Sequence, residues 1–384
     1  MRLFLVIEKE RKTMDLTQLR QQINETDKQI QQLFEKRMGL CMDVAEYKIK
    51  NNIQVFQSGR EKEIIDRVRG DAPDWLENSA EVLFTTLMDI SKSLQYRRFF
   101  ADTTNIVHRT LDLSAPAKVA VPGTVGSYSE EAACKLLPKG GFTFFADFED
   151  VIRCVMDGEA DFGILPIQNS TAGSVSRTYD LMKKYDLNIC ASTKVRIDHC
   201  LAAKKGTKIS DISIVYSHTQ ALMQCSDFLS ENHLKSHEHF NTALAADKVK
   251  ESSEPIAAVC SRKCAAEKGL DILAENIANA NDNFTRFILI SKETLIPEDA
   301  DTISVSLTLP HTRSALYRML TKFSVAGLNL TMIESKPIAN SDFDVVFYLD
   351  FEGSIKRPEV VKLITELENE LAFFRFLGNY KEIV

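Results

Sequence analysis

The spacing of apolar residues in the first hundred positions predicts helices and no strands. In residues 15–50, apolar side chains recur at heptad spacing, at Leu16, Ile23, Ile30 and Val44, with Leu19, Leu33, Phe34 and Cys41 beside them. Such a stripe is typical of one long helix whose apolar face packs against a partner. Residues 59–69 and 76–98 are expected to form two further helices, which Pro73 separates because proline cannot continue a helix.

After residue 100 the pattern changes to short apolar runs that alternate with helical segments. Residues 101–116 are expected to be a linker. Strands are predicted at 119–123, 162–167, 187–191, 211–218, 255–261 and 284–291, and helices at 130–137, 174–184 and 221–230. This alternation predicts a mostly parallel α/β sheet in two lobes with a cleft between them.

The last part of the chain shows a third pattern. Strands are predicted at 303–309, 329–336, 344–351 and 373–377, and helices at 314–323 and 358–371. The resulting order βαββαβ is typical of a ferredoxin-like α+β domain. The chain is therefore expected to contain three domains: an all-α domain at 14–100, a two-lobed α/β domain at 117–292 and an α+β domain at 300–384.

Composition and charge narrow the class of protein. A chain of 384 residues, with 44% hydrophobic and 26% charged residues, is too long for a single core. Its net charge of −7 argues against nucleic acid or a membrane surface as the main partner, so any anionic substrate must be held by a local cluster of cations. Eight scattered cysteines without CxxC spacing indicate the reducing cytoplasm. The apolar run at residues 3–7 is too short for a signal peptide or a membrane span.

Two cations lie on the apolar face of the long predicted helix. Arg37 occupies the next position of the heptad series, and Lys48 lies eleven residues further on, nearly on the same face. Burying two cations is unfavourable unless an anion lies between them. Arg20 lies about 25 Å along the axis from Arg37 and about 100° around it, so it can serve the same site only from a second chain. The helix is therefore expected to form one wall of a shared pocket for a small polyanion.

The sequence of residues 19–48, LRQQINETDKQIQQLFEKRMGLCMDVAEYK, followed by Arg60 and Glu61, resembles the helical chorismate mutases, which are intertwined dimers of three-helix chains. The resemblance covers residues 14–100. It implies that Arg20 of the neighbouring subunit and Arg37 hold the two carboxylates of chorismate. Lys48 and Gln95 would bind its ether oxygen, and Glu61 its ring hydroxyl. The full implied site is Arg20, Arg37, Lys48, Gln57, Arg60, Glu61, Ser91 and Gln95, with Ser91 on a carboxylate and Lys48, Gln95 and Glu61 as the catalytic residues. Gln57 stands where some relatives have aspartate, and its role stays open.

Five motifs of the middle region are weak when each is taken alone. They are GSYSEEAA at 126–133, LPIQNSTAGSV at 165–175, DHCL at 198–201, YSHTQ at 216–220 and NFTRF at 283–287. A catalytic dyad of His199 and Cys200 is not expected, because neighbouring residues of an extended chain point to opposite faces. The histidines at 233, 237 and 239 lack the accompanying spacing of a known metal motif, so no metal is expected.

Taken together and in this order, these motifs resemble prephenate dehydratase across residues 117–292. The resemblance implies that Thr285 is the catalytic residue, with Arg286 beside it as a carboxylate or structural anchor. The implied prephenate-binding residues are Ser127, Tyr128, Asn169, Ser170, Thr171, Thr285, Arg286 and Phe287. Gln168 replaces a glutamate common in the family, and Thr219 replaces a proline.

The C-terminal region resembles an ACT regulatory domain of the kind that binds phenylalanine. The motifs that carry this resemblance are SALYRML at 314–320 and ESKP at 334–337. The implied effector-binding residues are Ser314, Ala315, Leu316, Glu334, Ser335, Lys336 and Pro337. Arg313-Ser314 stands where glycine is usual, and Ser314 would be strained at a positive φ. Lys336 stands where arginine is usual, so sensitivity to phenylalanine is expected to be reduced.

The complete resemblance is to the bifunctional chorismate mutase–prephenate dehydratases of L-phenylalanine biosynthesis. It implies conversion of chorismate to prephenate by Claisen rearrangement, and of prephenate to phenylpyruvate by decarboxylative dehydration. It also implies a homodimer or larger assembly that needs no metal or organic cofactor. Two other hypotheses stay open: a non-catalytic amino-acid sensor whose helical segment only dimerises, and an enzyme that retains one of the two activities.

Overall fold

The computed structural model describes residues 15–53, 58–99, 106–280, 282–338 and 345–384. It contains two compact units. We call residues 1–103, 312–327 and 361–370 the helical unit, and residues 104–311, 328–360 and 371–384 the sheet unit. Within the described ranges, no helix has both the length and the apolar character that crossing a membrane requires.

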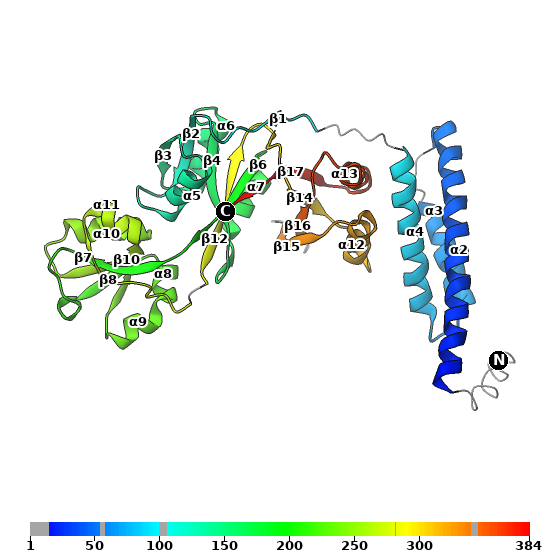
Figure 1. Ribbon diagram of the computed structural model, residues 1–384, viewed down its shortest axis with the longest axis horizontal. Coiled ribbons are helices and arrows are strands. Elements are labelled where there is room, and N and C mark those ends of the chain that lie inside the picture. The colour runs from blue at the N-terminus through cyan, green and yellow to red at the C-terminus, as the bar shows by residue number, and fades with distance from the viewer. Residues whose placement is uncertain (1–14, 54–57, 100–105, 281, 339–344) are drawn as a thin grey trace. The chain divides into compact units, whose positions relative to one another are not determined.

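The helical unit begins with the long helix that the heptad pattern predicts. Its helices are α2 (Leu16–Lys50), α3 (Ser58–Asp71), α4 (Glu77–Phe99), α12 (Ala315–Ala326) and most of α13 (Pro358–Glu370) (Figure 1). Helix α2 starts at a capping box, in which the Asp15 carboxylate accepts from the Gln18 amide at 2.8 Å and the Gln18 side chain accepts from the Asp15 amide at 3.1 Å. All three helices predicted for this region are confirmed.

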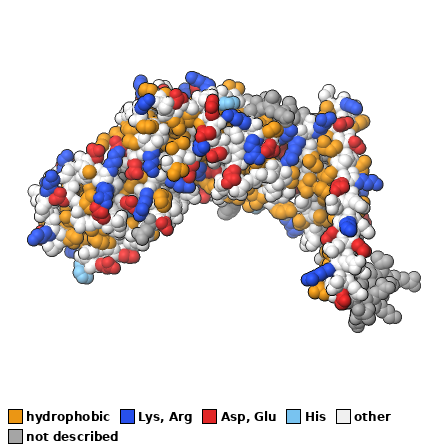
Figure 2. All heavy atoms as spheres, viewed as in Figure 1, with side chains coloured by type: hydrophobic (Ala, Val, Ile, Leu, Met, Phe, Trp, Pro, Cys, Tyr) orange, Lys and Arg blue, Asp and Glu red, His pale blue; other side chains and the backbone are white. Residues whose placement is uncertain are grey.

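Burial on α2 is confined to its C-terminal half. Its buried residues are Met38, Ala45 and Lys48. The stripe residues further toward the N-terminus remain exposed, Leu16 by 62%, Ile23 by 58% and Ile30 by 59%. Figure 2 shows apolar side chains at the surface of this unit. An apolar row of this length is unusual on the surface of a soluble helix and is typical of an interface.

The sheet unit contains two lobes, each built on a sheet (Figure 1). The larger sheet has the order β18-β6-β12-β4-β2-β3, with β5 beside β4. Its strands are β2 (Ala117–Pro122), β3 (Gly140–Phe145), β4 (Phe162–Asn169), β5 (Gly173–Ser174), β6 (Asn188–Arg196), β12 (Phe284–Ser291) and β18 (Glu382–Ile383). Its helices are α5 (Tyr128–Leu136), α6 (Phe148–Met156) and α7 (Ser176–Lys184).

The smaller sheet has the order β11-β7-β10-β8-β9. Its strands are β7 (His199–Ala203), β8 (Ile214–Ser217), β9 (Ser236–Glu238), β10 (Ile256–Ser261) and β11 (Asp271–Ala274). Its helices are α8 (Thr219–Gln224), α9 (Ser226–Glu231), α10 (Thr242–Glu251) and α11 (Arg262–Lys268), with a 3₁₀ turn at Ile209–Asp211. A short parallel pair, β1 (Arg109–Thr110) and β13 (Leu295–Ile296), lies outside both sheets.

The prediction of a mostly parallel sheet is wrong, because both sheets are mixed. Strand β12 pairs antiparallel with β4 and with β6, and β7 pairs antiparallel with β10 and with β11. The cause lies in two crossings between the lobes, from β6 into β7 and from β11 back into β12. Strands β7 and β12, which follow the two crossings, pair antiparallel with both of their neighbours, whereas β6 pairs antiparallel with β12 and parallel with β18. The two crossing segments contact each other where the Ile197 amide donates to the Asn283 carbonyl at 2.8 Å.

A third sheet belongs to the ferredoxin-like region. Along the chain its elements follow the predicted order βαββαβ, and the strands pair as β15-β16-β14-β17. These strands are β14 (Thr302–Thr308), β15 (Leu330–Pro337), β16 (Val345–Glu352) and β17 (Phe374–Tyr380). The sheet shares an apolar core with the larger lobe, in which the rings of Tyr179 and Tyr348 meet edge to face at 4.7 Å.

Two candidate active sites

The first candidate site lies where the C-terminal half of α2 packs against α4. Lys48 is buried, 9% exposed, and its Nζ donates to Oε1 of Gln95 at 3.5 Å. Arg37 points to the same helix, and its Nη1 donates to the Leu87 carbonyl at 3.0 Å. The two cations thus face one element, as their spacing along α2 predicts.

Two neutral groups of α4 complete this part of the site. Ser91 and Gln95 are buried, and they lie four residues apart on one face of the helix. The Ser91 hydroxyl donates to the Met88 carbonyl at 2.9 Å. Because Oε1 of Gln95 accepts from Lys48, its amide NH₂ remains a donor for a ligand.

Burial lowers the pKa of Lys48 below that of an ordinary lysine. Electrostatic interactions with Cys41 on α2 and Glu61 on α3 oppose this effect. The interaction with Glu61 means that α3 contributes to the electrostatics of the cluster. The first candidate site therefore combines side chains from α2, α3 and α4.

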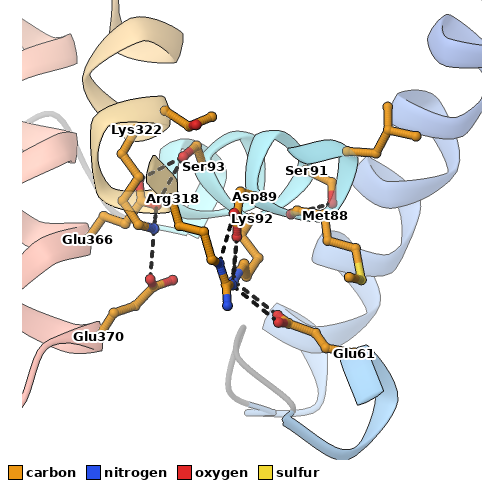
Figure 3. Close-up of polar contacts among 12 residues, drawn as sticks. Glu61, Met88, Asp89, Ser91, Lys92, Ser93, Arg318, Lys322, Glu366 and Glu370 are labelled. Carbon is orange, nitrogen blue, oxygen red and sulfur yellow. Dashed lines mark hydrogen bonds and ion pairs between the residues drawn. The ribbon is translucent and has the colours of Figure 1, made fainter. Parts of the chain in front are cut away.

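Glu61 is held by cations that the sequence reasoning did not identify. Its Oε1 lies 3.0 Å from Nζ of Lys92, and its Oε2 lies 3.4 Å from Nη2 of Arg318 (Figure 3). Lys92 could have been found, because it lies on the same helix as Ser91 and Gln95. Arg318 could not, because 257 positions separate it from Glu61.

Two of the residues implied for chorismate binding are not part of this cluster, and a third is not described. Arg20 is exposed near the far end of α2. Arg60 is exposed and pairs with Glu63 at 2.8 Å. Gln57 lies outside the described residues.

The second candidate site is a cavity of about 640 Å³ between the two lobes of the sheet unit. The larger lobe supplies the start of α5, the end of β4 and the start of β12, and the smaller lobe supplies His199 and α8. Of the predicted residues, Ser127, Tyr128, Asn169, Thr285 and Phe287 line the cavity. Thr285 is 9% exposed, so its hydroxyl faces the cavity rather than open water.

Asn169 organises the hydroxyl of Thr285. Its Nδ2 donates to Oγ1 of Thr285 at 2.9 Å and to Oδ1 of Asn283 at 2.7 Å. Its Oδ1 accepts from the Thr171 hydroxyl at 2.7 Å and from the Ala172 amide at 2.8 Å. Accepting a bond from Asn169 leaves the O–H of Thr285 as a donor toward the cavity.

A chain of hydrogen bonds crosses from this amide to the smaller lobe. The Gln224 amide NH₂ donates to Oγ1 of Thr171 at 3.3 Å, and its Oε1 accepts from Nε2 of His199 at 3.0 Å. The Tyr128 hydroxyl donates to the Asp198 carbonyl at 2.7 Å, next to His199. Burial lowers the pKa of His199, so its imidazole stays neutral near neutral pH. The sequence reasoning considered His199 only with Cys200 and missed its place in this cavity.

Ser170 and Arg286 do not line the interlobe cavity. The Ser170 hydroxyl donates to the Asp282 carbonyl at 2.8 Å and so ties down the segment that crosses between the lobes. Arg286 follows Thr285 on β12 and therefore points to the opposite face of the sheet. There its guanidinium pairs with Asp350 at 2.6 Å and donates to the Tyr380 hydroxyl at 2.7 Å. Of the two roles expected for Arg286, the structural anchor matches this position.

Each unit contains one of the two effector motifs. Ser314 has φ 63° at the start of α12, the positive φ at which a side chain is strained, followed by Ala315 and Leu316. In the sheet unit, Glu334 and Lys336 form an ion pair at 3.0 Å on β15, and both contact the Ser174 hydroxyl, at 2.8 and 2.6 Å. Ser335 is exposed, and the Pro337 carbonyl accepts from Lys183 at 2.7 Å.

Comparisons with known proteins identify the two regions that contain these candidate sites. The family model for chorismate mutase type II matches residues 19–96, and the model for prephenate dehydratase matches residues 119–295. The fold and the two sites thus define a chain that joins a mutase-type helical region to a dehydratase-type region.

Relatives carry the same two parts in one chain. A bifunctional chorismate mutase/prephenate dehydratase of Aquifex aeolicus is 31% identical over 95% of this chain and 98% of that protein. The chain therefore belongs to the family of bifunctional chorismate mutase/prephenate dehydratases.

Two solved structures resemble the region after the mutase part. A prephenate dehydratase of Arthrobacter aurescens, solved in complex with L-Phe, superposes with a TM-score of 0.64 at 31% identity. It covers 69% of this chain and 90% of that chain. A quorum quenching acylase, GqqA, superposes with a TM-score of 0.63 at 30% identity and covers 68% and 97%. Because a protein described by another activity shares this fold, the reaction has to be argued from the site.

Proposed function

We propose that this chain converts chorismate to prephenate in the cluster of α2, α3 and α4, and prephenate to phenylpyruvate in the interlobe cavity. The proposed domains are the mutase at 14–100, the linker at 101–116, the dehydratase at 117–292 and an ACT regulatory domain at 300–384. The pathway served is L-phenylalanine biosynthesis. Eight free cysteines support a reducing compartment, the cytoplasm.

The first reaction suits the residues of the helical cluster. A [3,3] rearrangement breaks a C–O bond and forms a C–C bond without a nucleophile or a proton transfer. The protein must fold the substrate into a chair and place donors where negative charge grows on the ether oxygen. Orientation can contribute about 7–11 kcal/mol, and one preorganised donor about 3–4 kcal/mol. Lys48 and the Gln95 amide are those donors in our proposal.

The remaining mutase residues hold the substrate. Arg37 binds one carboxylate bidentately, and Ser91 hydrogen-bonds a carboxylate. Glu61 accepts a hydrogen bond from the ring hydroxyl. The family resemblance also implies roles for Arg60 and Gln57 in binding chorismate. The single observation that carries this assignment is the place of Lys48, which is buried on α2 with its Nζ donating to Gln95 of α4, because this puts a cationic donor and a neutral amide side by side in the helical cluster.

A second copy of the chain completes the mutase site. Arg20 lies too far along α2 to reach its own cluster, and the exposed stripe beside it needs a partner surface. A homodimer in which each long helix crosses to the other chain buries the stripe and delivers Arg20 to the partner's Arg37 and Lys48. This one arrangement of two subunits accounts for both the exposed stripe and the distance of Arg20 from its own cluster.

The second reaction needs little from the protein beyond orientation and one donor. The ring carboxylate leaves as CO₂, and its bonding electron pair enters the ring. The ring hydroxyl leaves with its electron pair and becomes water once a proton is supplied. Aromatisation drives this loss, so a Thr285 O–H that stabilises the departing oxygen is sufficient. Asn169, Thr171, Ser127 and Tyr128 shape the cavity around it, and Ser170 and Arg286 support the strands that carry it.

Phenylalanine is the proposed effector, bound by the motifs at 314–316 and 334–337. The L-Phe complex of the Arthrobacter relative supports this assignment. The strained Ser314 and the engaged Lys336 favour weaker inhibition than a glycine and an arginine would give.

The test is to incubate the purified full chain with chorismate, follow prephenate and phenylpyruvate, and titrate in phenylalanine. We expect both products in sequence and inhibition by phenylalanine. Phenylalanine binding by calorimetry without turnover of either substrate would instead establish an amino-acid sensor. Prephenate as the final product would leave one activity only.

A further inference from the structure

We propose that Lys92 and Arg318 are positioning residues for the mutase reaction, which fix the Glu61 carboxylate for the ring hydroxyl of chorismate. This inference rests on the proposed role of Glu61. It adds a residue of α4 and a residue of α12 to the mutase site, the second of which comes from the C-terminal part of the chain.

Each oxygen of the Glu61 carboxylate is held by a different cation. Lys92 lies 3.0 Å from Oε1, and Arg318 lies 3.4 Å from Oε2. A carboxylate oxygen accepts about two hydrogen bonds, so each retains a lone pair for a ligand. Two cations, one on each oxygen, fix the plane of the Glu61 carboxylate and still leave it able to accept a hydrogen bond from a ligand.

Asp89 of α4 contacts both cations (Figure 3). Its side chain is 1% exposed and accepts from Nε and Nη2 of Arg318 at 3.0 and 2.8 Å and from Lys92 at 3.0 Å. Burial acts to raise the pKa of Asp89, but the bonds from Arg318 and the charge of Lys92 outweigh it and lower the pKa. The group is therefore two carboxylates and two cations, balanced in charge.

Attachment of α12 to α4 does not require this arrangement. A separate buried network already joins the two elements, in which Lys322 of α12 pairs with Glu366 and Glu370, and Glu366 accepts from the Ser93 hydroxyl of α4. Arg97 of α4 also donates to the Val325 carbonyl of α12 at 2.8 Å. What distinguishes Arg318 is that it extends to α3 and to Glu61.

Arg318 lies within the first effector motif, one helical turn after Ser314. Its backbone amide donates to the Ser314 carbonyl at 2.9 Å. Ser314, Arg318 and Glu61 also line one cavity of about 280 Å³ in the helical unit. A ligand that contacts Ser314 therefore acts on the turn that carries Arg318, and through Arg318 on Glu61. This gives the mutase site a physical connection to the effector motif.

The test uses the full chain with Arg318→Ala, Arg318→Lys and Lys92→Met, and Arg97→Ala as the matched control at the same helix pair. We expect Arg318→Ala and Lys92→Met to lower kcat/KM for chorismate about five- to tenfold, mainly through KM. Turnover of added prephenate should not change. Arg318→Lys should restore much of the loss, and Arg97→Ala should match the unmodified chain.

A double-mutant cycle separates positioning from support of the fold. In a Glu61→Gln background, Arg318→Ala should lower kcat/KM for chorismate little further, because the carboxylate that Arg318 positions is absent. Phenylalanine should also lose its effect on the mutase in Arg318→Ala while it still inhibits the dehydratase. Unchanged chorismate kinetics in Arg318→Ala, an equal loss in Arg97→Ala, or full additivity with Glu61→Gln would overturn the inference. Absence of chorismate turnover in the unmodified chain would instead overturn the proposed function itself, and this inference with it.

Discussion

Lys48, the donor that we propose for the ether oxygen, combines burial in the fold with a role in the reaction. Its ammonium is buried beside Gln95, and burial lowers its pKa. The nearby carboxylate of Glu61 offsets part of this effect. A dicarboxylate bound between Lys48 and Arg37 would offset more of it, so substrate binding and protonation of Lys48 favour each other.

The pH dependence of the mutase follows from the direction of this shift. The donor proposed for the ether oxygen is the protonated ammonium of Lys48, and its lowered pKa means that the proton is lost at a lower pH than in an ordinary lysine. We expect kcat/KM for chorismate to fall on the alkaline side as pH rises through that pKa. Lys48→Gln keeps a neutral donor, so its activity should be lower but flat over the same range. An alkaline decline that persists in Lys48→Gln would assign the titration to another group.

At the scale of the elements, the sequence predicts some parts well and others not at all. The three N-terminal helices, β12 and the βαββαβ order follow from strong periodicity and agree with the structure. Helices α6, α10 and α11 were missed. In α10 the buried face consists of Ala243, Ala245, Ala246 and Val249, and alanine gives little apolar contrast. Strand directions depend on how the chain crosses between the lobes, and the local pattern of apolar and polar residues does not indicate these crossings.

The same limit applies to the candidate sites. Arg37 and Lys48 could be placed from their spacing on one helix. The opposite orientations of Thr285 and Arg286 could have been inferred from strand alternation, but the partners of Arg286, Asp350 and Tyr380, could not. Partners that come from distant segments are fixed by tertiary packing alone.

Gly126 links the GSYSEEAA motif to the smaller lobe and gives an element-scale prediction. It has φ 87°, and a Cβ at this position would lie 2.8 Å from Cα of Cys264 on α11. Gly126→Ala should therefore lower the free energy of unfolding by about 1–3 kcal/mol and displace the lobes enough to reduce dehydratase kcat/KM about tenfold or more. Chorismate turnover to prephenate should remain.

The matched control for this change is Gly158→Ala. Gly158 also has a positive φ, 78°, but a Cβ there has open space around it. Because of backbone strain, Gly158→Ala should lower the free energy of unfolding by about 1–2 kcal/mol. It should leave the dehydratase activity unchanged. Equal dehydratase activity in the two variants would mean that the contact between Gly126 and Cys264 does not set the shape of the cavity.

On the scale of the whole molecule, we propose that a second chain completes the helical unit. The exposed apolar row on α2 and the distant Arg20 both support a partner that presents the same helix. The proposed symmetric dimer would use this arrangement twice, because each chain would give its Arg20 and receive the other. In this proposal, mutase function belongs to the pair of chains.

Complementation between two inactive chains tests this sharing. Arg20→Ala and Arg37→Ala homodimers should each lose most mutase activity. In a heterodimer purified with two different tags, one site has both arginines and the other has neither, so we expect about half the activity of the unmodified dimer. A heterodimer as inactive as its parents would show that Arg20 does not serve the neighbouring chain.

The central claim is that one chain holds two separate active sites, and one set of assays tests it most directly. Arg37→Ala and Thr285→Ala are each incubated with chorismate and, in a separate assay, with prephenate. The amounts of prephenate and phenylpyruvate are followed over time. Thr285→Ser serves as the variant that keeps the hydroxyl. The account predicts that Arg37→Ala dehydrates prephenate normally and leaves chorismate untouched. Thr285→Ala should convert chorismate and accumulate prephenate, and Thr285→Ser should recover phenylpyruvate formation. Normal dehydration by Thr285→Ala, or loss of both reactions in either single variant, would contradict it.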